Sequence, residues 1–174
     1  MNRIDAAFDR ARRENAHGFI PYFTAGYPDR ETFVAILRAA ADAGSLAIEV
    51  GIPFSDPIAD GPIIQASSEA ALRAGVRMGD IFDMIREFRA THDTSVVLMG
   101  YVNPILHHGF DAFVRDAADA GADGAIVPDL PPEDAGDLIG PARERGFATI
   151  FLAATTSTDE RLARIAEAST GYVS

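Results

Sequence analysis

The chain has 174 residues, 48% of them apolar, and a formal net charge of -11. This length suffices for one domain with a substantial core, and a clean division into two domains would be unusual. The negative charge argues against nucleic acid or an anionic membrane as partner, and the densest basic cluster, Arg10, Arg12 and Arg13, fits a solvated helix face. No apolar run has the length of a membrane span or the character of a secretory signal, so the expected compartment is the cytoplasm.

Two residue types are missing from the sequence. It contains no cysteine, and all fifteen basic residues are arginines, so it contains no lysine either. These absences exclude a thiol nucleophile, a disulfide, a thiolate zinc site, a lysine Schiff base and a Walker-type phosphate loop. Carboxylates remain as the groups that could perform acid–base chemistry.

The first half of the chain shows alternating helical and strand patterns. Asp29 is a plausible N-cap, and the sequence Ala-Ala-Asp-Ala-Gly ends a predicted helix at 40–44 and again at 117–121, where glycine permits a left-handed cap. The predicted elements are, in order, a capping helix over 2–15, a strand over 19–24, a turn over 26–29, a helix over 30–43, a strand over 46–51, and a helical pair over 63–74 and 78–91.

The second half repeats this rhythm. Its predicted elements are a strand over 95–99, a loop over 100–109, a helix over 110–120, a strand over 124–127, a loop over 128–132, a helix over 133–145, a strand over 148–152, a helix over 158–168 and a terminal strand that opens at Gly171. Apolar strands that each precede a crossover helix predict a parallel sheet covered on both faces.

Two α/β architectures fit this alternation, an open sheet and a (β/α)8 TIM barrel. Length alone favours the open sheet. Chemically distinctive residues, however, follow nearly every strand, for example Thr24, Tyr101, Asn103 and Asp129. A barrel draws its site from many strand ends, whereas an open sheet concentrates its ligand at one switch point. The strand ends therefore favour the barrel, with a rearranged open parallel sheet as the alternative.

The stretch 47–65, AIEVGIPFSDPIADGPIIQ, is the most informative in the chain. It places Glu49 inside a predicted buried strand, where a charge costs several kcal/mol unless it is paired or protonated. Glu49 is thus either hydrogen-bonded scaffolding or a proton-transfer group with a raised pKa. Asp56 and Asp60 follow in the next loop, at the end of the sheet where α/β proteins place their functional loops.

Five segments closely resemble the alpha subunit of tryptophan synthase: FIPYFTAGYPD at 19–29, IEVGIPFSDPIADGPIIQ at 48–65, GYVNPI at 100–105, DGAIVPDLPPE at 123–133 and FLAATTSTDER at 151–161. The resemblance implies a TIM barrel, here one incomplete domain over 1–174 with about six βα units. It also implies a lyase that cleaves indole-3-glycerol phosphate to indole and glyceraldehyde 3-phosphate. No cofactor is expected in this chain, and pyridoxal phosphate is expected only in the beta subunit that acts as partner.

The resemblance also implies roles for single residues. By position, Glu49 resembles the family's proton-transfer residue and Asp60 its second catalytic acid. Residues that match the wall of the indole pocket, or alternatively ordinary core, are Tyr22, Met99 and Ile126. Residues that match loops contacting the beta subunit, or alternatively plain barrel loops, are Pro53, Asp56, Pro57, Asn103 and Asp129. The adjacent His107 and His108 have no acidic or histidine cluster near them in the sequence and are interpreted as surface residues without a metal.

Length separates this chain from the family it resembles. An eight-unit barrel takes roughly 250 residues, whereas this sequence stops within the predicted sixth strand, without a second aromatic that the family carries near Tyr172. The phosphate-binding loops of a barrel follow strands seven and eight. Three hypotheses therefore stand: a lyase site impaired by the loss of its phosphate anchor, a non-catalytic module that docks on the beta subunit, and a fragment without a function of its own.

Overall fold

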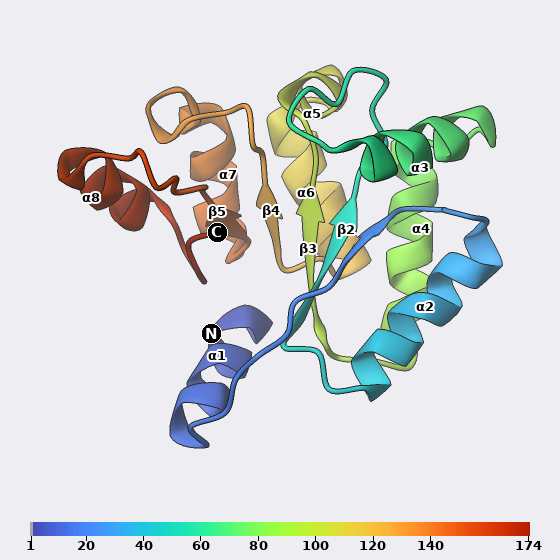
Figure 1. Cartoon of the computed structure of the whole chain (residues 1–174), viewed down its shortest axis with the longest axis horizontal. Helices are drawn as coiled ribbons and strands as arrows, with labels where there is room; N and C mark the ends of the chain where they lie inside the picture. Colours follow the sequence, from blue (N-terminus) through green and yellow to red (C-terminus); the bar gives the residue numbers. More distant parts are fainter. Residues whose placement is uncertain (1) are drawn as a thin grey trace.

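Five parallel strands form one sheet, in sequence order, in this computed structural model, which describes residues 2–174 (Figure 1). The strands are β1 (Tyr22–Thr24), β2 (Ala47–Gly51), β3 (Ser95–Met99), β4 (Gly124–Ile126) and β5 (Ala148–Ile150). Each strand pairs in parallel with its neighbour in sequence, so that Tyr22 is in register with Glu49 and Glu49 with Val97. Within the described residues β1 and β5 do not pair with each other, so the sheet is open, and its strand order is that of a barrel.

Helices precede and connect the strands, and those that follow β1 cover the outer face and the ends of the sheet, whereas α1 packs on the inner side (Figure 1). They are α1 (Arg3–Arg13), α2 (Arg30–Asp42), α3 (Pro62–Arg73), α4 (Met78–Arg89), α5 (Val102–His108), α6 (Phe110–Ala120), the 3-10 turn η1 (Pro132–Asp134), α7 (Gly136–Arg145) and α8 (Asp159–Ala168). The main core lies between the outer face of the sheet and these helices, where Phe33, Phe88 and Phe113 are fully buried. No helix of the described residues is both long enough and apolar enough to cross a bilayer.

Local sequence signals account for several helix ends. The Asp29 carboxylate accepts hydrogen bonds from the Thr32 backbone N–H and hydroxyl, both at 2.8 Å, and so caps α2 as predicted. The repeated pentapeptide also behaves as predicted, because Gly44 and Gly121 adopt left-handed φ angles of +85° and +98° directly after their helices. Glycine is the residue that enters this region without strain.

Besides the helix predicted over 133–145, which is divided into η1 and α7, three predicted elements differ from the structure. The first strand is shorter, because Pro21 has no N–H to donate, although its carbonyl still accepts a hydrogen bond from Glu49 N at 2.8 Å. The predicted loop over 100–109 contains α5, in which Pro104 lies within the first turn, where a missing N–H removes no intrahelical bond. The prediction of an all-loop segment there was wrong.

The third difference is at 170–174, which is not a regular strand. It nevertheless lies beside β5, since Thr170 N donates to Thr149 O at 2.8 Å and Ser174 N donates to Phe151 O at 3.1 Å. The segment thus takes the place of a sixth strand without forming a continuous ladder. Its position matters for the site described below.

The inner face of the sheet has a second, smaller core. Val97, Ile126 and Ile150 are buried there together with Ile4 of α1, and Phe8, Met99 and Tyr172 pack against this cluster. Helix α1 lies near the end of the sheet where the strands begin and contacts β3 (Figure 1). The opposite end, where the strands finish, carries the loop after β2 together with α5 (Figure 1).

A buried ion pair ties the amino-terminal end of the sheet together. The Asp123 carboxylate, whose side chain is 5% exposed, accepts hydrogen bonds from Arg89 Nη2 at 2.7 Å, Arg3 Nη1 at 3.0 Å and Val96 N at 2.9 Å. Asn2 caps α1 and donates from its side chain to the carbonyls of Asp123 and Gly146 at 2.7 and 2.9 Å. These bonds attach α1 to the starts of β4 and β5.

Candidate active site

Glu49 lies in the middle of β2 and faces the inner side of the sheet. Alternation along the strand gives Ala47, Glu49 and Gly51 one face and the buried Ile48 and Val50 the other. Ile48 and Val50 belong to the main core on the outer side, so Glu49 points inward. Desolvation by burial raises the pKa of the Glu49 carboxyl above its usual range, which favours the protonated form.

Tyr172 is the hydrogen-bond partner of Glu49. Its hydroxyl donates to Glu49 Oε1 at 2.9 Å, across 123 positions of sequence. This bond stabilises the carboxylate and partly offsets the effect of burial on the pKa of Glu49. The Tyr172 ring is stacked on Phe8 of α1 with ring centroids 5.3 Å apart, so the donor is fixed in position by packing.

Asp60 is held at the strand-end loop by a tyrosine from the neighbouring strand. The Tyr101 hydroxyl donates to Asp60 Oδ2 at 3.1 Å and accepts a hydrogen bond from Ala59 N at 2.9 Å. The Gln65 side chain fixes the backbone of the same loop by donating to Asp60 O at 2.8 Å. Asp60 is half-buried, so its carboxylate is positioned by protein groups and still reaches solvent.

Tyr22 lies close to both acids. Burial raises the pKa of its hydroxyl to about 12, and the neighbouring negative charges of Asp60 and Glu49 add to this rise. The Tyr22 ring covers Gly51, where a Cβ atom would approach the Tyr22 hydroxyl oxygen to 1.9 Å. Gly51 is therefore required for the close approach of this ring to β2.

The other two predicted pocket residues lie on the same inner face. Met99 pairs in register with Gly51 and with Ile126, and both side chains belong to the inner cluster. Ile126 is 1% exposed, whereas Met99 is half-buried. The structure thus brings Glu49, Tyr22, Met99 and Ile126 to one face of the sheet, with Asp60 at its carboxyl-terminal edge. Their contact with a substrate stays a prediction.

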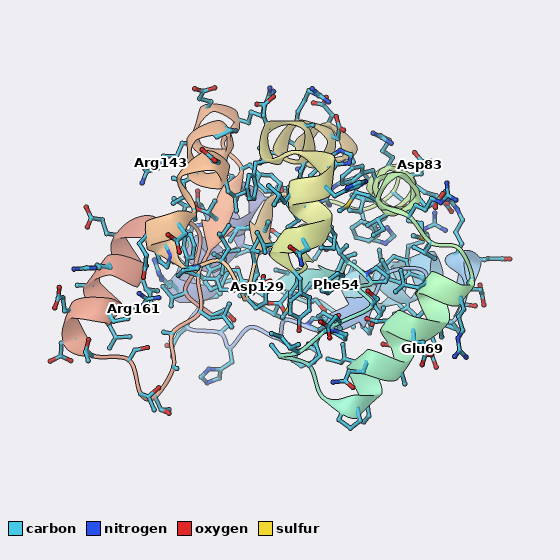
Figure 2. The ribbon with its side chains drawn as sticks, turned by 90° about the horizontal axis from the view of Figure 1, so that it is seen from above. Phe54, Glu69, Asp83, Asp129, Arg143 and Arg161 are labelled. Carbon is cyan, nitrogen blue, oxygen red and sulfur yellow. The ribbon has the colours of Figure 1, made fainter. Side chains whose placement is uncertain are left out.

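The five residues predicted to contact a partner lie on loops at the carboxyl-terminal end of the strands. Asp56, Asn103 and Asp129 are exposed, Pro57 is half-buried and Pro53 is buried. Figure 2 shows Phe54 and Asp129 near each other on this face: the Phe54 ring contacts Tyr101 at 5.3 Å between centroids, and Asp129 Oδ1 accepts a hydrogen bond from Val102 N at 2.9 Å. These loops therefore form one surface around the start of α5.

The histidines lie on α5, close to a cavity outside the strands. This cavity, of about 580 Å³, has apolar walls that include Ile52, Phe54 and Met78, and its lining contains neither Glu49 nor Asp60. His108 Nε2 lies 2.8 Å from Asp116 Oδ2, which keeps the pKa of that carboxyl low. Within residues 2–174 no group of three or more His, Asp or Glu side chains is placed to hold a metal ion.

Sequence reasoning missed two contacts of the site. Tyr172 was noted only as part of a terminal strand, and nothing in the local pattern indicates that its hydroxyl reaches Glu49. Tyr101 was singled out as a strand-end residue, but its bond to Asp60 joins loops after two different strands. Its position directly after β3, next to β2 in the sheet, is the signal that could have suggested the contact.

The fold and the site together define the class. Parallel strands in barrel order, outer helices, and carboxylates on the inner face and at the carboxyl-terminal strand ends are features of the (β/α)8-barrel class, in which active sites lie at that end. The described residues supply five of its strands in an open arrangement. The sheet is open because β1 and β5 do not pair within the described residues, but its strands keep the barrel order, so the alternative of a rearranged strand order is wrong.

Comparison with known proteins identifies the family. The family model described as tryptophan synthase alpha chain matches residues 8–174, so the chain belongs to this family. The tryptophan synthase alpha chain of Burkholderia thailandensis is 48% identical over 174 residues, and that of Methylibium petroleiphilum is 47% identical. Each alignment covers 99% of this chain and 64% of the relative.

Solved structures show the same fold. The crystal structure of tryptophan synthase subunit alpha from Legionella pneumophila matches with a TM-score of 0.96 and 40% identity, covering 99% of this chain and 66% of that one. A tryptophan synthase complex from Pyrococcus furiosus matches with a TM-score of 0.85 and 46% identity, covering 88% and 63%. The chain thus spans about 64% of the length of the curated relatives that it matches.

Proposed function

We propose that the protein acts in the cleavage of indole-3-glycerol phosphate to indole and glyceraldehyde 3-phosphate, with Glu49 as its proton-transfer group. The single observation that carries this proposal is the environment of Glu49: an inward-facing carboxyl in a parallel strand, with a raised pKa and one fixed hydroxyl donor. A carboxyl whose pKa is raised holds its proton more readily than an exposed one, so it can give the proton and take one back during a reaction. Membership of the family supplies the reaction.

Each acid has a distinct part in this reaction. Carbon–carbon cleavage needs a proton delivered to C3 of the indole and a proton removed from a hydroxyl of the glycerol chain. Protonated Glu49 delivers the first, and the resulting carboxylate, stabilised by the Tyr172 hydroxyl, accepts the second. Asp60, held by Tyr101 at the solvent edge, stabilises the positive charge that develops on the indolenine nitrogen.

The remaining groups bind rather than react. Tyr22, Met99 and Ile126 provide an apolar inner wall that suits an indole ring. The resemblance gives this chain no cofactor and assigns pyridoxal phosphate to the beta subunit. The proposed compartment is the cytoplasm.

The test is the rate of indole release from indole-3-glycerol phosphate by the 174-residue chain and by Glu49→Gln. The conservative amide keeps an acceptor for Tyr172 and removes the proton, so the variant should lose all measurable turnover. Glu69→Gln, on the exposed surface of α3, is the matched control and should keep the parent rate. Equal rates in the parent and Glu49→Gln would contradict the proposal.

We expect the parent rate itself to be low. The resemblance assigns phosphate binding to loops outside the stretch that aligns here, and a substrate whose phosphate is not held loses orientation at the reacting carbon. Single-turnover conditions with excess protein are therefore the suitable format, because they detect chemistry even when the substrate binds weakly.

A second candidate function is docking on the beta subunit without catalysis. The observation that favours it is that Asp56, Asn103 and Asp129 are exposed on loops at the carboxyl-terminal strand ends, together with Ile58, which is 78% exposed. Proline residues in these loops limit the conformational entropy lost on association. The matched Pyrococcus furiosus structure is a complex, which supports such a partner.

Size-exclusion co-elution with a purified beta subunit tests this second function. The parent chain should co-elute at micromolar concentration, and Asp56→Ala should abolish the complex. Asp83→Ala, on the exposed surface of α4, removes a carboxylate far from these loops and should leave the complex intact. Absence of any complex with the parent chain would count against docking.

A further inference from the structure

We propose that a second ligand site, for a phosphate-type oxyanion, lies beneath α1 at the end of the sheet where the strands begin. It is lined by two arginines and two serines and is separate from the strand-end loops that carry Asp60 (Figure 1). The residues of the site are Arg3, Arg10, Ser45 and Ser95, and the proposed reaction uses none of them.

The proposed site coincides with a cavity in the structure. A cavity of about 320 Å³ lies between α1 and the segments that lead into β2 and β3. On the helix side its lining consists of Arg3, Ala6, Ala7 and Arg10, a spacing of three, four and seven residues that places them on one face of α1. The two alanines are short, so the hollow lies between the two arginine side chains.

Ser95 provides an independent sign of a missing partner. The residue is 2% exposed, and its Oγ is buried without a hydrogen-bond partner among the described residues. Alternation along β3 gives Ser95 the same face as Val97, which belongs to the inner cluster with Ile4 of α1. The unpaired hydroxyl therefore belongs to the face that α1 covers. A buried hydroxyl without a partner costs free energy, and a bound acceptor would remove that cost.

The charges around the cavity favour an anion. Arg10 is exposed and makes no ion pair within residues 2–174, which leaves its guanidinium available. Arg3 binds Asp123 at 3.0 Å and lies 3.8 Å from Asp93, whose side chain is 94% exposed and can move away from the rim. Asp93 is the carboxylate in the cavity lining and would compete directly with a ligand, whereas Asp123 is not part of that lining.

The combination of arginine and serine side chains in the cavity favours a phosphate-type anion. Guanidinium groups donate parallel hydrogen bonds to phosphate oxygens, and serine hydroxyls donate to the same oxygens. The volume holds an inorganic phosphate or a small phosphate ester. The hollow is lined by polar groups over much of its surface, including Thr94 and Ser45, which makes it unsuitable for a purely apolar molecule.

The experiment is a titration of the isotopically labelled chain with inorganic phosphate, followed by amide resonances at ionic strength kept constant with chloride. Saturable shifts should appear at Ser45, Leu46 and Ser95 and along the Arg10 turn of α1. Arg10→Gln should weaken binding by about tenfold, since it removes a charge-assisted donor. Arg13→Gln, three residues along the same helix but outside the cavity lining, should change it by less than about twofold.

Ser95→Ala provides a second, separate readout. It should weaken phosphate binding by several fold, and it should not lower the thermal midpoint of the free protein, because the hydroxyl makes no bond that would be lost. Asp93→Asn should tighten binding by removing the competing carboxylate. A loss of thermal stability in Ser95→Ala would mean that the hydroxyl is structural and would overturn its assignment.

Two further outcomes would overturn the proposal: shifts that do not saturate, and equal weakening by Arg10→Gln and Arg13→Gln, which would indicate general attraction to a basic surface. A parallel titration with glycerol 3-phosphate distinguishes the source of the ligand. Equal affinities assign the site to free phosphate, and tighter binding of the ester at the same resonances assigns it to a phosphorylated metabolite. The measurement uses no substrate, so its outcome is independent of the proposed lyase activity.

Discussion

The two ends of the sheet handle their charged groups in opposite ways. At the amino-terminal end, Asp123 is buried and receives three hydrogen bonds, two of them from arginines. At the carboxyl-terminal end, Asp56 and Asp129 are exposed, and among the described residues Asp60 accepts one side-chain hydrogen bond, from Tyr101. Glu49 lies between the two ends and has, within residues 2–174, one hydroxyl donor and no cationic partner.

This difference shows how one sheet separates stability from chemistry. A carboxylate paired with two arginines holds structural elements together, whereas a carboxylate with a single neutral donor is left able to meet a substrate or a charged ligand. In barrels the strand starts generally carry the first kind of residue and the strand ends the second. The following predictions test whether the division holds here.

The largest effect is expected at Asp123. Asp123→Ala leaves Arg89, whose side chain is 10% exposed, buried without its counter-ion and also frees Arg3 and the Val96 N–H. Breaking a buried pair from one side costs about 3–5 kcal/mol. Urea unfolding followed by circular dichroism measures the loss. Asp83→Ala, which removes an exposed partner of Arg86, should cost less than about 1 kcal/mol. Similar losses of unfolding free energy in Asp123→Ala and Asp83→Ala would contradict the structural role proposed for the amino-terminal end of the sheet.

A smaller effect is expected at Asn2. Asn2→Ala removes the N-cap of α1 and both side-chain bonds to the carbonyls of Asp123 and Gly146, at an expected cost of about 2 kcal/mol. The matched control is Thr158→Ala, which removes an N-cap from α8 that makes no bond to another strand, at about 1 kcal/mol. Equal losses of unfolding free energy in the two variants, measured in urea, would show that the Asn2 side-chain bonds to the carbonyls of Asp123 and Gly146 contribute no stability.

The smallest effect, and one of opposite sign, is expected at Glu49. Folding raises the pKa of this carboxyl, so the folded protein favours the protonated form of Glu49. The contribution of that form to the free energy of unfolding is fully present at low pH and is lost as the pH rises through the raised pKa. Glu49→Gln has no charge to bury and should therefore raise the thermal midpoint by a few degrees at pH 8. The gain should shrink towards pH 4. A lower midpoint at pH 8 would show that the carboxylate is a stabilising group.

Most of the fold can be predicted from the sequence because the signals that define its helices and strands lie within a few residues of each element. Asp29 caps its helix through a residue three positions away, and Gly44 ends the same helix by its own backbone freedom. Apolar strand patterns located all five strands. The helix over Val102–His108 was not predicted because it is short and contains a proline. A proline in a short segment is typical of a loop.

The sequence singles out the two acids Glu49 and Asp60 as candidates, but it does not indicate their hydrogen-bond partners. Glu49 stands out because a charge in an apolar strand is costly wherever the strand lies. Tyr172 and Asp123 form their key bonds to residues 123 and 34 positions away, and nothing in the neighbouring sequence encodes those distances. Such contacts arise from packing of the complete sheet and require coordinates.

The bond between Tyr172 and Glu49 links two equilibria. The segment that carries Tyr172 lies against β5 through the Thr170 and Ser174 backbone. The Tyr172 hydroxyl bond by itself lowers the pKa of Glu49, and by reciprocity the ionised form of Glu49 holds the Tyr172 hydroxyl more strongly than the protonated form does. The segment beside β5 is thus a proton-linked element, whose docking and the charge on Glu49 depend on each other reciprocally.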